Sequence, residues 1–133
     1  MLALLRQAAL VALPSSEIDQ RSFWLGCIGI REDGVMVSAK NGAVEFHNTI
    51  ENYQLVPSSH AEGRVLRKLG KGGVIFVARV SRKDGSLAMA RPCGMCQVRL
   101  KSFKVRKVYY TINENQYGVW FPDSDTDKIY KAE

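Results

Sequence analysis

The segments Ser59-His60-Ala61-Glu62 and Pro92-Cys93-Gly94-Met95-Cys96 decide how this chain folds. Each stands where a helix is expected to begin, after a loop or the end of a strand. Together they offer one imidazole, two thiolates and a nearby carboxylate. Imidazole and thiolate are preferred zinc ligands, and three of them leave the fourth tetrahedral position for water, as in a catalytic site.

Read together, the two segments give H-x-E followed by P-C-x-x-C, which is the signature of zinc-dependent base deaminases. The chain therefore resembles the cytidine/deoxycytidylate deaminase superfamily. The resemblance implies that His60, Cys93 and Cys96 hold Zn²⁺. It also implies that Glu62 carries a proton from the activated water to the ring nitrogen and the leaving amine. The backbone amide of Ala61 is expected to approach the pyrimidine carbonyl.

Each motif also has a purely structural interpretation. The pattern from Ser59 to Glu62 matches a capping box, in which the glutamate returns a hydrogen bond to the start of the helix. Pro92 and Cys93 fit the beginning of a helix whose small residues face the core. The metal site is favoured because both motifs occur in one chain, each at a predicted helix start.

Two alignments compete for the sugar contact. Asn41, just after the second expected strand, matches in position the asparagine with which deaminases commonly hold the sugar or base, although Asn-Gly is also a turn sequence. Thr49-Ile50-Glu51-Asn52 resembles the N-x-E-N ribose-binding segment of cytidine deaminases, with Thr49 in place of the first asparagine. Asn41, Glu51 and Ala61 are the expected substrate contacts, and we favour Asn41 for the sugar.

The pattern of apolar residues predicts the element order α-β-β-α-β-α-β-β. This is a three-layer α/β fold, with a five-stranded mixed sheet flanked by helices. The short loop 113–116 predicts that the last two strands form an antiparallel hairpin. The expected helices are residues 1–13, 60–69 and one beginning at Pro92, and the expected strands are Phe23–Ile30, Val35–Ala39, Val74–Val80, Val105–Ile112 and Tyr117–Phe121. Residues 123–133 are expected to form a surface tail or a short terminal element.

Composition favours one globular domain over residues 1–133, with a metal-binding core at about residues 23–121. The chain has 46% hydrophobic and 24% charged residues, which suits an ordinary folded domain. No apolar stretch approaches the roughly 20 residues that cross a bilayer, and the first residues lack the leading positive charge of a signal peptide. Three cysteines are too few for a disulfide framework, so we expect a cytoplasmic protein. The net charge of +6 favours an anionic partner.

The expected activity is hydrolysis of the C–N bond of a cyclic amidine. The substrate would be a free cytosine nucleoside or nucleotide (cytidine, deoxycytidine or a monophosphate), converted to its uracil form with release of ammonia. Small members of the superfamily complete their pockets with neighbouring subunits, so a homo-oligomer is expected. The alternative is a cytosine or adenine deaminase of single-stranded DNA or RNA, but the sequence lacks an evident basic aromatic extension to hold a strand. An inactive zinc-binding module is a third interpretation, which the presence of Glu62 disfavours.

Overall fold

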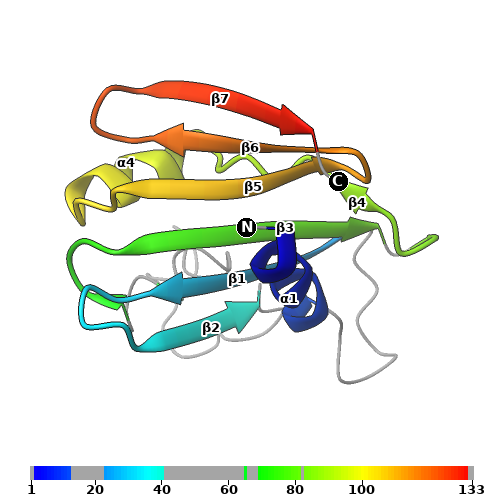
Figure 1. Ribbon diagram of the computed structural model, residues 1–133, viewed down its shortest axis with the longest axis horizontal. Coiled ribbons are helices and arrows are strands. Elements are labelled where there is room, and N and C mark those ends of the chain that lie inside the picture. Colours follow the sequence, from blue (N-terminus) through cyan, green and yellow to red (C-terminus); the bar gives the residue numbers. More distant parts are fainter. Residues whose placement is uncertain (1, 13–22, 41–64, 66–68, 82, 132–133) are drawn as a thin grey trace, which may run out of the picture.

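The computed structural model describes residues 2–12, 23–40, 65, 69–81 and 83–131, which form a mixed sheet with helices on both faces (Figure 1). Two complete helices are described, α1 (Leu2–Ala12) and α4 (Gly94–Ser102). The strands are β1 (Phe23–Ile30), β2 (Met36–Lys40), β3 (Val74–Ser81), β4 (Leu87–Ala88), β5 (Lys107–Asn113), β6 (Gln116–Phe121) and β7 (Thr126–Lys131). No helix in these ranges is long and apolar enough to span a membrane.

The sheet is two antiparallel halves joined at one parallel seam. Its strand order is β2-β1-β3-β5-β6-β7, and the short strand β4 pairs with β3. Strands β3 and β5 run parallel, with Val74 opposite Lys107 and Val77 opposite Tyr110. The other described pairs are antiparallel. A parallel pair needs a crossover connection, and here the crossover contains β4 and α4.

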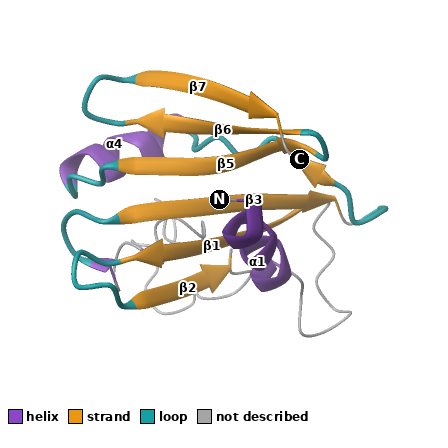
Figure 2. Cartoon of the chain, in the orientation of Figure 1, coloured by secondary structure: helices purple, strands orange, loops and turns teal. Residues whose placement is uncertain are grey.

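Strand β3 lies in the middle of the sheet, as its sequence predicts. Its run Val-Ile-Phe-Val-Ala-Arg-Val is almost wholly apolar, which is typical of a strand covered on both faces. Alternate side chains enter two separate cores: Ile75 and Val77 pack with Leu100 of α4, whereas Phe76 packs with Leu5 of α1. The helices therefore form the outer layers on opposite faces (Figure 2).

Helix α1 has the predicted apolar side and ends before Pro14. Leu5, Ala8 and Ala12 are buried. The helix approaches β1 closely at Gly26, where a Cβ atom would overlap the backbone of Ala8 and Ala12. Glycine is required there by this contact, and the small residues of α1 allow it.

Two predicted features differ in detail from the structure, and a third lies mostly outside the described residues. The sheet has more strands than the expected five, because the described residues also form β4 and β7. Helix α4 begins at Gly94 rather than at Pro92, because Cys93 keeps an extended backbone and caps the helix. Of the expected helix 60–69, only Val65 and Leu69 are described; both are helical and pack in the core on the α4 face. The antiparallel pairing of β5 with β6 is confirmed.

Candidate metal centre

The structure places two of the predicted metal ligands, Cys93 and Cys96, at the start of α4. The third ligand His60, the proton carrier Glu62 and the three predicted substrate contacts Asn41, Glu51 and Ala61 lie outside the described residues. Among the described residues, no third His, Cys, Asp or Glu joins the two cysteines in a group suited to a metal. The predicted metal and substrate roles of these residues thus stay predictions.

The geometry of the two cysteines fits the predicted zinc donor set. Cys93 is the N-cap of α4, and Cys96 lies three residues later on the same side of the first turn. Cys93 is exposed, whereas Cys96 is 1% exposed. The positive end of the helix dipole stabilises a thiolate, which is the form that binds zinc. No disulfide joins Cys27, Cys93 and Cys96, all of which lie in the described part.

The segment before Cys93 is held at three residues by hydrogen bonds to β5 and to the turn that follows it. The Leu87 amide donates to Glu114 Oε2 over 2.6 Å, and the Ala88 carbonyl accepts from Thr111 Oγ1 over 2.7 Å. The Ala90 amide then donates to the Thr111 carbonyl over 2.8 Å. Thr111 is 1% exposed, so it supplies both contacts from inside the core. The path of the chain into the cysteine pair is therefore fixed by β5.

Arg91, two residues before Cys93, is held by β7. Its Nε and Nη2 atoms donate to the two carboxylate oxygens of Asp127, each over 2.9 Å. The Tyr110 hydroxyl donates to the same carboxylate over 2.7 Å. The Arg91 guanidinium also lies 5.8 Å from the centre of the Trp120 ring, in a cation–π contact. We call Arg91, Tyr110 and Asp127 the arginine clamp.

The clamp changes the proton affinity of its members. The hydrogen bond from Arg91 is the main cause that lowers the pKa of Asp127, and Tyr110 adds to it. Burial is the main cause that raises the pKa of Tyr110 to about 12, with the Asp127 carboxylate next. A Cβ atom at Gly118 would overlap the Tyr110 ring, so this glycine makes room for the clamp. At neutral pH the clamp is therefore an ion pair with a protonated tyrosine.

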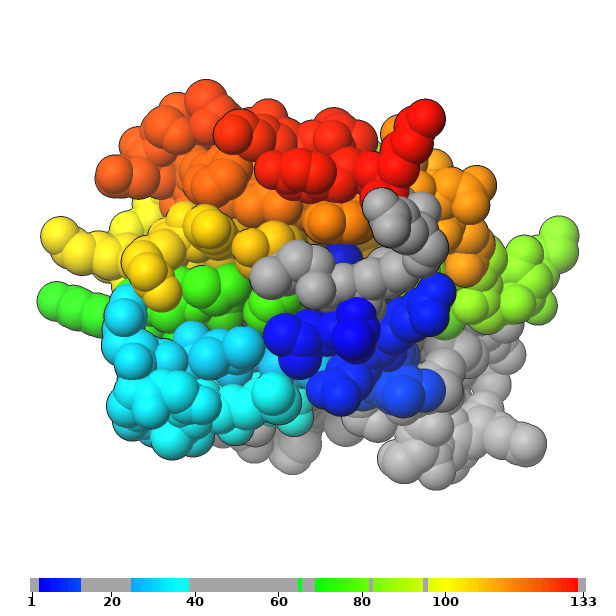
Figure 3. All heavy atoms as spheres, viewed as in Figure 1, coloured from blue at the N-terminus to red at the C-terminus, as the bar shows by residue number. Residues whose placement is uncertain are grey.

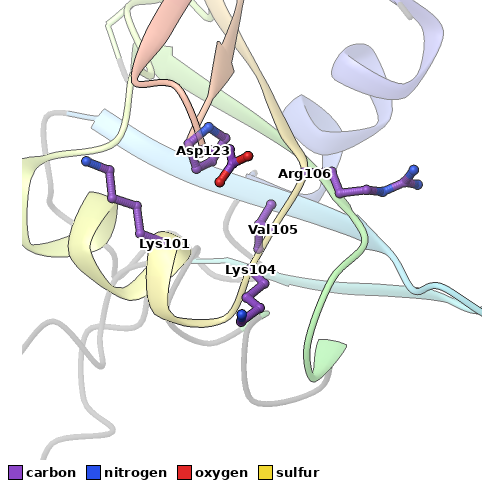
Figure 4. Close-up of a pocket in the computed structure, with 6 residues that line it drawn as sticks. Lys101, Lys104, Val105, Arg106 and Asp123 are labelled. Carbon is purple, nitrogen blue, oxygen red and sulfur yellow. The ribbon is translucent and has the colours of Figure 1, made fainter.

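A hollow of about 560 Å³ lies at the other end of α4, away from the cysteines. Its lining includes Lys101, Lys104, Arg106 and Asp123. Figure 4 shows the three cationic side chains pointing away from one another, with the Asp123 carboxylate between them. These cations therefore do not converge on one position where an anion could bind.

Neither the clamp nor β7, the strand that carries Asp127, was predicted from the sequence. A signal for β7 is present: Pro122-Asp123-Ser124-Asp125 is a cluster of turn residues, followed by Thr126-Asp127-Lys128-Ile129-Tyr130-Lys131 with β-branched and aromatic members. Together with Tyr117–Phe121, this pattern favours a second hairpin. Nothing local in the sequence pairs Arg91 with Asp127, because that contact depends on the strand register.

Comparison with known proteins gives the family. The sequence model of the cytidine and deoxycytidylate deaminase zinc-binding region matches residues 2–112, which include both cysteines. A mutant cytidine deaminase from Mycobacterium tuberculosis is similar, with 23% identity, 84% of each chain covered and a TM-score of 0.49. A second structure of cytidine deaminase from Mycobacterium tuberculosis has 23% identity, 83% of each chain covered and a TM-score of 0.48. No curated protein sequence matches. On the sequence model alone, the chain belongs to the zinc-binding cytidine and deoxycytidylate deaminase family.

Proposed function

We propose that this chain is a zinc-dependent hydrolase that deaminates a free cytosine nucleoside or nucleotide. The observation that carries the proposal is the pair Cys93 and Cys96 at the start of α4, inside the region matched by the deaminase family. The anchored segment before them supports it, because ligands held by a rigid scaffold keep the geometry that a metal requires. A homo-oligomer and a cytoplasmic location belong to the same proposal.

In this proposal His60, Cys93 and Cys96 hold the metal, and the cysteines bind as thiolates. When bound, zinc supplies a water of lowered pKa, which can attack at neutral pH. The described ligands suit this role, since Cys93 and Cys96 lie three residues apart in the first turn of α4 and can contact one ion. Arg91 acts as a positioning residue, because its ion pair with Asp127 holds the backbone that leads to Cys93.

Glu62 moves the protons of the reaction. Its carboxylate takes a proton from the attacking water and delivers it to the ring nitrogen next to the reacting carbon. A second proton from the water goes to the exocyclic amine, whose C–N bond then breaks. One water is consumed, one carbonyl oxygen is gained by the ring and one ammonia leaves. The Ala61 amide donates to the pyrimidine carbonyl, and Asn41 holds the sugar, with Glu51 as the competing contact.

The substrate is tested by ammonia release from the zinc-loaded chain. The panel contains cytidine, deoxycytidine, their monophosphates, adenosine and short single-stranded oligonucleotides. We expect conversion of at least one free cytosine compound and little change with salt, because few charges meet a small ligand. If only the oligonucleotides are converted, and the conversion falls steeply as salt rises, the substrate is a polynucleotide rather than a free nucleoside or nucleotide.

The metal premise is tested by elemental analysis of purified variants. Cys96→Ser is expected to lose bound zinc, since it removes one predicted thiolate ligand. The matched control is Cys27→Ala, which removes the third, buried cysteine far from α4 in sequence and should keep the metal. Equal zinc content in the parent and Cys96→Ser would contradict the proposed ligand set.

A further inference from the structure

The sheet face that carries α1 is only partly covered by that helix. Helix α1 packs with side chains of β1 and β3 and extends to β5, while β6 and β7 lie beyond it (Figure 2). Strand register fixes which side chains of the described strands stand on this part of the face, because alternate residues point to the same face. We call it the aromatic–basic face. Its exposed or half-buried members are Lys107, Tyr117, Phe121, Lys128 and Tyr130, and the buried Tyr109 and Val119 lie on the same face. The same side of the molecule is seen in Figure 3.

Aromatic rings are presented along this face. Tyr117 and Tyr130 lie opposite each other on β6 and β7 and stack with their ring centres 5.3 Å apart. Tyr130 remains 41% exposed, and Phe121 is half-buried. The buried Tyr109 stacks on Phe76 with 4.7 Å between ring centres and supports the exposed rings from the core. A rigid, partly exposed ring on a sheet offers a flat apolar surface to another planar group.

Cations flank these rings. The Lys107 ammonium lies 6.0 Å and the Lys128 ammonium 5.8 Å from the centre of the Phe121 ring. The seven residues of the face include no carboxylate. The neighbouring Asp127 of β7 stands on the opposite face, where Arg91 and Tyr110 bind it. The charge of the face is therefore positive, in keeping with the net charge of the chain.

A shallow hollow of about 260 Å³ continues the face towards α1. Leu4, Phe76 and Tyr109 give it apolar walls, while Arg106 and Lys107 stand at its edge. Glu32 also lines it and approaches Arg106 Nε at 3.4 Å. An apolar hollow beside cations suits a planar base that is attached to a phosphate.

We infer that the aromatic–basic face binds single-stranded nucleic acid. Unpaired bases stack on aromatic side chains, and lysines beside the rings contact the phosphates. A duplex does not suit the face, because its bases are already stacked and unavailable to the rings. This strand-binding surface lies across the sheet from α4 and its cysteines, so it is separate from the deaminase site and does not depend on the proposed substrate.

The test is fluorescence anisotropy with the full zinc-loaded chain and a labelled oligothymidylate of about 12 nucleotides, within the range bound by single-strand modules. We expect saturable binding that weakens as salt rises. Tyr130→Leu and Phe121→Leu keep apolar packing but remove a stacking surface, and each should weaken binding roughly tenfold. A competing duplex of the same length should displace the strand poorly.

The matched variants Lys128→Ala and Lys131→Ala distinguish binding at this face from general attraction by the net charge of the chain. Both residues are exposed on β7 and both changes remove one positive charge, but the register places Lys131 on the other face. Lys128→Ala should weaken binding several-fold and lower the salt slope by about one, while Lys131→Ala changes affinity less than about twofold. Equal losses would overturn the inference in favour of general charge attraction. If the parent is a dimer that dissociates in Tyr130→Leu, and oligonucleotide binding is unchanged, the inference is wrong and a second copy of the chain covers the face.

Discussion

The two faces of the sheet use their polar and aromatic residues differently. On the α4 face, Arg91, Tyr110 and Asp127 bind one another beside the buried Trp120 ring. On the α1 face, Tyr130 is partly exposed, and the ammonium groups of Lys107 and Lys128 lie near the Phe121 ring. A single strand, β7, contributes to both. The polar groups of the α4 face therefore hold one another in a fixed geometry, whereas those of the α1 face are the ones that we propose contact a ligand.

The largest effect should come from the proposed deamination chemistry. Glu62→Ala removes the proposed proton carrier, and kcat should fall by roughly 10²- to 10⁴-fold while the fold and zinc content stay unchanged. Val98→Ala is a control on the exposed side of α4, where Val98 is 68% exposed. Steady-state rates and elemental analysis measure both variants. An unchanged rate in Glu62→Ala would leave Glu62 as a helix cap.

Stability at alkaline pH tests the burial of Tyr110 on the α4 face. The pKa of Tyr110 is raised to about 12 in the folded chain from 10.0, so unfolded chains ionise first as pH rises. Stability should be fully present below pH 10 and fall by on the order of 3 kcal/mol between about pH 10 and 12. Denaturant unfolding of the parent and Tyr110→Phe measures this. The same decline in both proteins would mean that Tyr110 ionises as an ordinary tyrosine.

The contact that holds the sugar can be ranked by two variants. Asn41→Ala should lower kcat/KM by an amount equal to roughly 1–3 kcal/mol, the cost of a lost buried hydrogen bond with its partner left unsatisfied. Glu51→Gln should cost much less. Neither variant should alter oligonucleotide binding if that binding belongs to the α1 face. The opposite ranking in kcat/KM would favour the nucleoside-type alignment.

The smallest effect concerns the clamp itself. Asp127→Asn keeps the shape of the side chain but removes the charge that Arg91 and Tyr110 bind, and should cost about 1–2 kcal/mol of stability at neutral pH. The lowered pKa of Asp127 means that the parent keeps this stabilisation above pH 3.8 and loses it as pH falls further. Asp123→Asn in the adjacent exposed turn is the control, and thermal unfolding is the measurement. Equal melting temperatures for parent and Asp127→Asn would show that the clamp stabilises nothing.

The local sequence was enough to predict the elements that have a strong pattern of their own. The apolar run at Val74–Val80 predicts a central strand, and the short loop at Asn113–Gln116 predicts the antiparallel hairpin. Cys93 and Cys96 could be placed near a helix start because Pro92 and the spacing of the thiols are local features. The helix boundary differed because Cys93 caps α4, which depends on its backbone conformation.

Contacts set by register could not be predicted in the same way. Arg91 and Asp127 are distant in the chain, and they meet only because β7 pairs with β6 so that Asp127 stands opposite Trp120. The aromatic–basic face has the same origin: Lys107, Phe121 and Lys128 belong to three strands and form one surface only after pairing. Residues 123–133 are mostly polar, so the sequence does not reveal that alternate side chains of β7 point to opposite faces of the sheet.

The parallel seam has a consequence for the order of folding. Strands β5, β6 and β7 are joined by short turns, so this meander needs little loop closure to form. The seam pairs β3 with β5 only after the whole crossover is in place. We expect the meander to form first and the seam later, as loop entropy dictates. Pulse-labelled hydrogen exchange should show amides of β6 protected before those of β3, and simultaneous protection would contradict this order. Cys93 and Cys96 lie on the crossover, so a competent metal site would arise only when the two halves of the sheet have met.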